Sequence, residues 1–159
     1  MIKNYLWIFL ISMVPLIELR GAIPVSQALQ MPIIPSYIVS IIGNMIPVPI
    51  IYFFARKVLE WGADKKFIGK FFTAILEKGT NAGQKIQEKA GKGFFIALFL
   101  FVGIPLPGTG AWTGTLAASL LGLSFKETVI SVVLGVLLAG LIMMAGSFGL
   151  FSALFAISG

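Results

Sequence analysis

Most apolar residues in this chain are gathered into four long blocks, at residues 4–31, 33–54, 94–123 and 128–157, rather than into amphipathic stripes. The second block has 22 residues without a charge, and the fourth is also uncharged. At about 1.5 Å of rise per residue, such a block covers the hydrocarbon core of a bilayer, which is about 30 Å thick. The pattern predicts membrane-spanning helices at 33–55 and 128–157, the first of them kinked by its internal glycine and prolines.

The first and third blocks are each broken near the middle. Pro15, Glu18, Arg20, Gly21 and Pro24 interrupt the first block, and the sequence IPLPGTGAW interrupts the third at residues 104–112. A half-helix, a break and a second half-helix can enter the bilayer and leave by the same face. The sequence therefore predicts broken hairpins at 4–31 and 94–123. Two full spans, with both termini in the cytoplasm, are the rival topology.

A charged segment separates the two halves of the chain. Nine of the twelve basic residues lie at 56–92, which predicts a cytoplasmic loop by the positive-inside rule and explains the net charge of +6 better than nucleic-acid binding does. Within it, apolar residues at three-to-four spacing predict an amphipathic helix on the inner leaflet, namely Phe67, Ile68, Phe71, Phe72, Ile75 and Leu76. Residues 79–93 are polar and interrupted by glycine, which indicates a weak helix or a linker.

The order of elements repeats: a broken hairpin and then a spanning helix occur twice. If each unit crosses the membrane once, two units in series have opposite orientations, and the hairpin tips meet near the middle of the bilayer. GAIP at Gly21–Pro24 and GAWT at Gly110–Thr113 correspond loosely across the halves. We expect a single all-α integral membrane domain over residues 1–159, built from two inverted repeats, that is a multi-pass protein of the cytoplasmic membrane.

Composition supports the membrane assignment and narrows the chemistry. The chain is 58% hydrophobic and 11% charged, against about 45–50% and about 25% in soluble domains. It has no Cys and no His, so thiolate metal sites, haem ligation by His and His-dependent catalytic triads are excluded. We expect no enzymatic activity, no metal and no cofactor. The glycine-rich fourth block favours close helix packing and a homodimer or larger assembly.

Glu18 and Arg20 are the strongest candidates for a functional site because they are the only charges between Lys3 and Arg56. A charge at membrane depth costs at least about 2.5–3.5 kcal/mol and is a functional candidate by default; mutual neutralisation is the alternative. Helices expected to begin after Gly21 and Gly110 would direct their positive ends, with Arg20, toward an anion. Glu18 is the expected proton-coupling residue, since burial disfavours its charged form while Arg20 favours it.

The second break supplies further candidates. Backbone N–H groups there could form an anion-binding nest with the Thr109 hydroxyl, although Pro and Gly also suffice to explain a simple turn. Asn44 could donate a hydrogen bond, and Trp112 could form a wall of the site. The expected substrate-binding residues are Glu18, Arg20, Gly21, Asn44, Pro105, Pro107, Gly108, Thr109, Gly110 and Trp112.

Two motifs, PLIELRGAIP at Pro15–Pro24 and GIPLPGTGAWTG at Gly103–Gly114, resemble those of the small multidrug export protein family. That family is similar to the DedA (SNARE-associated Golgi protein, VTT domain) superfamily, in which two re-entrant hairpins face each other and some members are implicated in polyprenyl-phosphate recycling or lipid scrambling. The resemblance implies roles for Glu18 and Arg20 and for the Pro105, Pro107 and Gly108 turn. One departure matters: DedA-type second hairpins carry an arginine, whereas this chain has no charge between Lys92 and Lys126.

Three functions remain open from the sequence. The first is a transporter or flippase for an anionic lipid phosphate such as a polyprenyl phosphate, either with or without coupling to protons. The alternative is export of small amphipathic drugs, with Glu18 binding a cation in exchange for protons. The third is a non-transporting protein that shapes membranes or assists assembly. The expected partners are membrane lipids and the substrate, with no nucleic acid.

Overall fold

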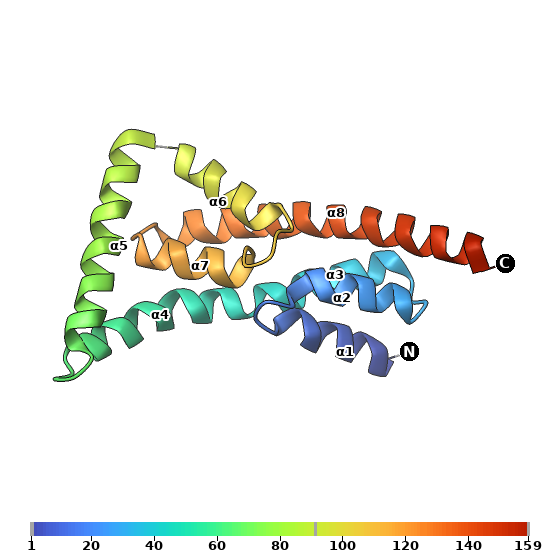
Figure 1. Cartoon of the computed structure of the whole chain (residues 1–159), viewed down its shortest axis with the longest axis horizontal. Helices are drawn as coiled ribbons and strands as arrows, with labels where there is room; N and C mark the ends of the chain where they lie inside the picture. The colour runs from blue at the N-terminus through green and yellow to red at the C-terminus, as the bar shows by residue number, and fades with distance from the viewer. Residues whose placement is uncertain (1, 91, 159) are drawn as a thin grey trace.

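The computed structural model describes residues 2–90 and 92–158, and these form helices joined by turns, which confirms the all-α class (Figure 1). The helices are, in chain order, α1 (Ile2–Met13), α2 (Glu18–Ala28), α3 (Ile33–Met45), α4 (Pro47–Ala63), α5 (Gly69–Ala90), α6 (Gly93–Gly103), α7 (Ala111–Leu120) and α8 (Phe125–Ser158).

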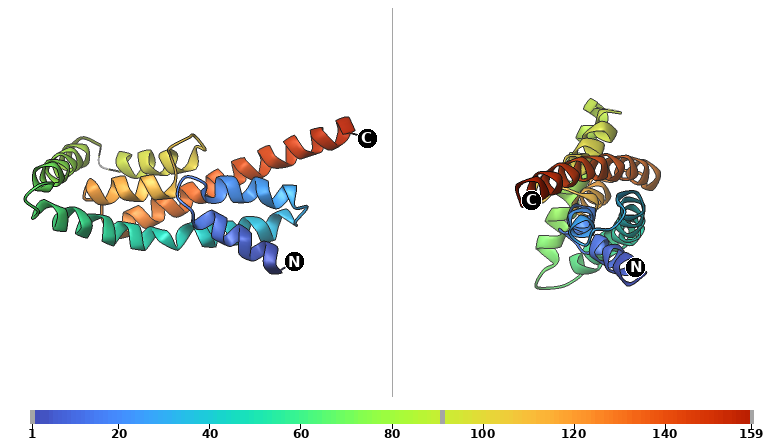
Figure 2. Two further views of the ribbon diagram at one scale, coloured as in Figure 1. Left: turned by 60° about the horizontal axis from the view of Figure 1, so that its bottom comes forward. Right: turned by 90° about the vertical axis from the view of Figure 1, so that its right-hand side faces the viewer.

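Two helical hairpins lie in opposite halves of the molecule, with their turns directed toward each other (Figures 1 and 2). The first hairpin is α1–α2, which packs against α3; the second is α6–α7, which packs against α8 and α4. Tyr37 on α3 donates a hydrogen bond to the carbonyl of Leu137 on α8 at 3.0 Å, and Ser119 on α7 donates one to the carbonyl of Tyr52 on α4 at 2.7 Å. These contacts hold the two halves together around their meeting point.

Two stretches are long and apolar enough to cross a membrane, Ile33–Ala63 and Phe125–Leu150. Only 28% and 33% of the residues in their most apolar windows are buried, so these helices are not the covered core of a soluble domain. The first stretch is interrupted at Ile46, between α3 and α4. Pro47 follows directly and cannot continue the hydrogen-bond pattern of α3, which accounts for the break.

The exterior is far more apolar than that of a soluble protein, while the interior holds polar as well as apolar side chains. Large apolar side chains are exposed along α1, α3, α4 and α8, whereas the buried residues of α3 are Ser36, Ser40, Gly43 and Asn44. Water would penalise such an exterior, and lipid would not. Together with the two long apolar helices, this distribution makes the chain a membrane protein.

The first break does not lie where the sequence placed it. We expected the second half-helix to begin after Gly21, but α2 begins at Glu18, and the Gly21 N–H donates to the carbonyl of Ile17 at 3.0 Å. Pro15 disfavours helical geometry in the residue before it, so the chain turns earlier, over residues 14–17. Gly110, by contrast, directly precedes α7. The two glycines of GAIP and GAWT therefore occupy different helical positions.

The charged segment is more helical than its composition suggested. Helix α4 continues to Ala63, and α5 runs from Gly69 to Ala90. Of the weak helix and the linker that residues 79–93 left open, the structure has the helix over most of the stretch. Figure 1 shows α5 lying across one end of the bundle, where it connects α4 to α6. Two glycines of the fourth block serve packing within the chain: a Cβ at Gly135 would meet Val102, and one at Gly140 would meet Tyr37.

Candidate functional site

Glu18 lies at the contact between the two hairpins and is 3% exposed. Its Oε2 accepts a hydrogen bond from the Ala111 N–H at 3.2 Å, and its Oε1 accepts one from the Trp112 N–H at 3.0 Å. These are the first two amides of α7, which have no partner within that helix. The carboxylate of the first hairpin therefore caps the positive end of a helix in the second, where the helix dipole favours a negative charge.

Arg20 stabilises the other side of the same break. Its guanidinium reaches the last turn of α6 and the loop that follows, donating to four carbonyls: Val102 at 3.1 Å, Ile104 at 3.3 Å, Leu106 at 2.7 Å and Thr109 at 2.5 Å. The carbonyls at the end of a helix carry a partial negative charge that a cation complements. The planar guanidinium can serve several acceptors at once, which a lysine ammonium could not do equally well.

Glu18 and Arg20 do not form an ion pair with each other. In the described part of the chain, the ion pair within 4.0 Å is Arg56–Glu60, on the exposed side of α4. The two charges are therefore not in direct contact, although the charge of Glu18 still acts electrostatically on Arg20. Each charge is directed to the backbone of the second hairpin, one to the start of α7 and one to the end of α6.

The backbone is strained on both sides of this contact. Leu16 and Glu18 have φ angles of 70° and 51°, in the left-handed region that costs a non-glycine residue about 1–2 kcal/mol. Gly110 has φ 139° and ψ −174°, and a Cβ there would overlap the Glu18 carboxylate. A position that requires glycine thus lies directly against the buried acid. Such strain is found where surrounding contacts hold a functional geometry in place.

The loop of the second hairpin is closed by its own groups. The single hydrogen of the Thr109 hydroxyl is shared between the carbonyls of Ile104 and Leu106, at 3.0 and 2.9 Å. Gly108 has φ 80° and, like Pro107, is exposed. The Thr109 hydroxyl is thus engaged within its own turn, which Arg20 holds from the other hairpin. The expected nest of backbone N–H groups at residues 107–110 stays a prediction.

A small cavity of about 220 Å³ opens beside Glu18. Its lining is mainly apolar and comes from the first turn, α4, the second loop and α7: Pro15, Leu16, Glu18, Ile51, Thr109, Trp112, Thr113 and Leu116. The Trp112 indole N–H donates to the carbonyl of Met13 at 3.2 Å, which fixes the ring at this wall. Glu18 supplies the charged group of the cavity.

The structure brings together only part of the predicted site. Glu18, Thr109 and Trp112 line the cavity, and Gly110 lies against the Glu18 carboxylate. Arg20 acts on the loop behind it, while Gly21, Asn44 and Pro105 are not among the lining residues. The apolar lining residues were missed because apolar side chains in a membrane sequence give no local signal that distinguishes a cavity wall from lipid contact.

Asn44 is fully buried on α3, and neither of its side-chain polar atoms has a hydrogen-bond partner among the described residues. The hydroxyls of Ser40, Thr115 and Ser131 share this property. Buried polar groups without partners are costly unless water or a ligand satisfies them. These residues are isolated polar groups in an interior that also holds a large apolar cluster, and none of them lines the Glu18 cavity.

Chemically, this arrangement presents a carboxylate in an apolar cavity. The two α7 amides occupy one acceptor position on each oxygen, and a carboxylate has about four such positions, so acceptor capacity remains for a ligand. The expected anion site is not what the geometry favours, because the amides of α7 already hold Glu18 and the guanidinium of Arg20 already holds four carbonyls.

The fold and this site define a helical membrane protein in which two facing hairpins enclose a small apolar cavity with one acidic group. The family described as "Putative small multi-drug export protein" matches residues 18–142. The chain belongs to this family, and the match includes Glu18, Arg20 and the whole second hairpin. No curated protein and no solved structure matches the chain. The relationship to the DedA superfamily stays a prediction from the motifs.

Proposed function

We propose that this protein exports small amphipathic cations across the cytoplasmic membrane in exchange for protons, with Glu18 as the shared binding group. The observation that carries the proposal is the Glu18 carboxylate, 3% exposed, at the wall of an otherwise mainly apolar cavity. A buried acid in such surroundings favours a ligand that is apolar in its body and positive at one point. The export description of the family supports the same conclusion.

The sign of the charge on the substrate follows from which polar groups of the site already have hydrogen-bond partners within the protein. An anionic lipid phosphate needs free N–H donors, yet those at the start of α7 hold Glu18. The Arg20 guanidinium is equally committed, to four backbone carbonyls. The one charged group that lines the cavity is the Glu18 carboxylate, which is negative. Export of amphipathic cations therefore replaces the lipid-phosphate reading as the proposed function.

The cavity also limits the kind of cation. Its volume of about 220 Å³ is below the range of about 300–1,000 Å³ that is typical of drug-sized sites, so a compound with one or two rings fits better than a large one. Trp112 offers an aromatic face to a positive charge, an interaction worth about 0.5–2 kcal/mol. Ile51 and Leu116 contact the apolar part of the ligand.

Exchange with protons follows from competition for one carboxylate. When Glu18 binds a proton, its negative charge disappears and the cation loses its main attraction. A neutral carboxyl group is also a weaker acceptor for the Ala111 and Trp112 amides, since hydrogen bonds to charged groups are about twice as strong as neutral ones. Protonation therefore both releases the ligand and loosens the contact between the two hairpins, which couples occupancy to conformation.

For the topology, we propose that both hairpins are re-entrant. Their helices have 12, 11, 11 and 10 residues, or about 15–18 Å each, which is too short for a core of about 30 Å. With the charged segment at residues 56–92 in the cytoplasm, α6–α7 enters from the cytoplasmic side and α1–α2 from outside. This placement brings Glu18 to the middle of the bilayer, where access from either side can alternate.

The test is transport by the purified protein in lipid vesicles, with a proton gradient and either a fluorescent aromatic cation or a labelled polyprenyl phosphate. We expect efflux of the cation that depends on the gradient and is abolished by Glu18→Gln. Glu60→Gln is the matched control, because Glu60 is an exposed acid on α4, and it should transport normally. Movement of the lipid phosphate without movement of the cation would refute the proposal.

A further inference from the structure

The corner between α4 and α5 lies outside the Glu18 site and does not depend on the export proposal, although the inference drawn from it uses the proposed cytoplasmic position of residues 56–92. Two glycines allow the helices to approach here: a Cβ at Gly62 would lie 2.8 Å from the Phe72 ring, and one at Gly69 would lie 2.5 Å from the Ala63 carbonyl oxygen. The Gly69 N–H donates to the carbonyl of Lys65 at 2.7 Å, which closes the turn. The corner thus has a defined shape.

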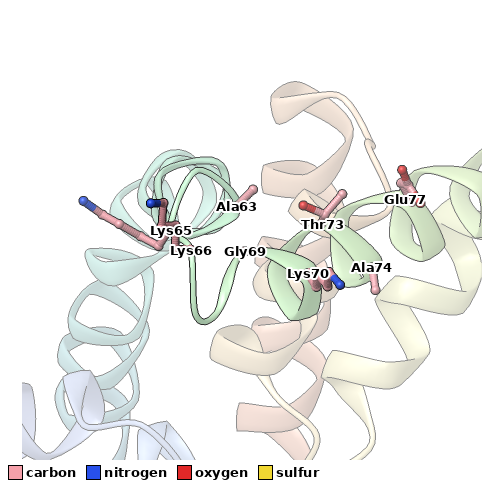
Figure 3. Close-up of a pocket in the computed structure, with 8 residues that line it drawn as sticks. All are labelled: Ala63, Lys65, Lys66, Gly69, Lys70, Thr73, Ala74 and Glu77. Carbon is pink, nitrogen blue, oxygen red and sulfur yellow. The ribbon is translucent and has the colours of Figure 1, made fainter.

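A cavity of about 380 Å³ lies in this corner (Figure 3). Its lining combines small side chains with three lysines, a threonine and one acid: Ala63, Lys65, Lys66, Gly69, Lys70, Thr73, Ala74 and Glu77. Figure 3 shows Lys65 and Lys66 on the turn and Lys70 on α5. Three positive charges against one negative charge leave the cavity basic, which favours an anionic group.

Large apolar side chains flank the basic cavity and point out of the molecule. Phe67 is fully exposed, and Phe71 and Trp61 are 67% and 62% exposed. The Lys65 ammonium lies 4.6 Å from the centre of the Trp61 ring, so an aromatic and a cation share one surface. Exposed aromatic residues next to lysines are typical of segments at the boundary between acyl chains and headgroups.

We infer that this corner binds the phosphate of an anionic phospholipid in the cytoplasmic leaflet. The aromatic side chains of Phe67, Phe71 and Trp61 enter the acyl boundary, which places the three lysines at the level of the phosphate. The threonine hydroxyl of Thr73 adds a neutral donor. The negative charge of Glu77 repels a headgroup that carries its own carboxylate. A phosphatidylglycerol headgroup therefore fits best, because its only charge is the phosphate. A bound lipid of this kind anchors α5 against the membrane surface.

The experiment titrates the purified full chain in neutral detergent with phosphatidylglycerol, with phosphatidylcholine of the same acyl chains, or with inorganic phosphate. The test variant is K65Q/K66Q/K70Q. The matched control is K57Q/K78Q/K92Q, which removes the same charge from the same segment at positions outside the cavity. Thermal unfolding without lipid identifies any loss of fold, and K65Q/K66Q, which keeps Lys70, serves as the second variant if the triple variant unfolds.

We expect phosphatidylglycerol to bind the wild type and the control with similar affinity, and the test variant at least roughly tenfold more weakly, given the contribution of each lysine near an anionic surface. Phosphatidylcholine should bind weakly to all three. Equal weakening in the test and control variants would show general attraction and overturn the site. Binding of phosphatidylcholine as tight as that of phosphatidylglycerol, or of inorganic phosphate as tight as that of the lipid, would overturn it as well.

Discussion

Gly110 is the position where one added carbon atom should disturb the site most. Its φ of 139° and ψ of −174° lie in a region that is essentially restricted to glycine. A Cβ at this position would lie 2.8 Å from Cδ of Glu18 and closer still to one carboxylate oxygen. Gly110→Ala must therefore strain the backbone and push Glu18 away from the amides of Ala111 and Trp112.

The size of the effect follows from these two terms. Strain at such a position costs about 1–3 kcal/mol, and loss of one of the two charged hydrogen bonds costs about 1.5–3 kcal/mol. The variant should therefore lose about 2.5–6 kcal/mol of unfolding free energy. Gly108→Ala is the matched control. Gly108 also has a positive φ, 80°, but nothing lies within 4 Å of a Cβ there. Only the backbone cost of about 1–2 kcal/mol applies to it.

Both variants would be compared with the wild type by unfolding in the same detergent and by efflux of the aromatic cation from vesicles. We expect Gly108→Ala to be slightly destabilised and to transport, and Gly110→Ala to be strongly destabilised and inactive. Equal destabilisation of the two variants would refute the assigned contact between Gly110 and Glu18. Normal transport by Gly110→Ala would show that the α7 amides need not hold the acid.

Three further predictions concern other parts of the structure. Arg20→Lys should lower the unfolding free energy by about 2–4 kcal/mol, since an ammonium cannot reach all four carbonyls. The control Arg56→Lys changes an exposed ion pair and should alter the unfolding free energy by less than about 1 kcal/mol. Equal changes in the two variants would contradict the role of Arg20. Because the chain has no cysteine, a single introduced cysteine can be labelled with a thiol reagent. The cysteine of Lys3→Cys should react only with reagent outside the cell, and that of Lys78→Cys only with reagent inside. Labelling of both cysteines from the cytoplasm would favour full spans. Asn44→Leu should stabilise the protein by about 1–3 kcal/mol in thermal unfolding, because it removes buried polar groups that have no hydrogen-bond partner among the described residues. Destabilisation would contradict this and would indicate that water or a ligand binds the Asn44 side chain.

The first hairpin shows where sequence reasoning failed. Glycine and proline at Gly21–Pro24 are strong local signals for a break, yet this stretch continues as helix, because α2 begins at Glu18 and packs against α3 and α8. Tertiary packing overrides such local preferences. For the polar stretch at residues 79–93 the sequence left a weak helix and a linker open, and the structure has helix through Ala90.

The sequence by itself determined the class of protein, because uncharged blocks of twenty or more residues are stable as helices in lipid and would expose too much apolar surface in water. It also singled out Glu18 and Arg20, since a charge within such a block is costly enough to need a reason. Only the tertiary structure decided what these two charges do. Their partners at Val102–Trp112 lie more than 80 residues away along the chain, and no local pattern encodes which helix end will meet which side chain. That meeting turns an expected anion site into a carboxylate that caps α7 and faces an apolar cavity.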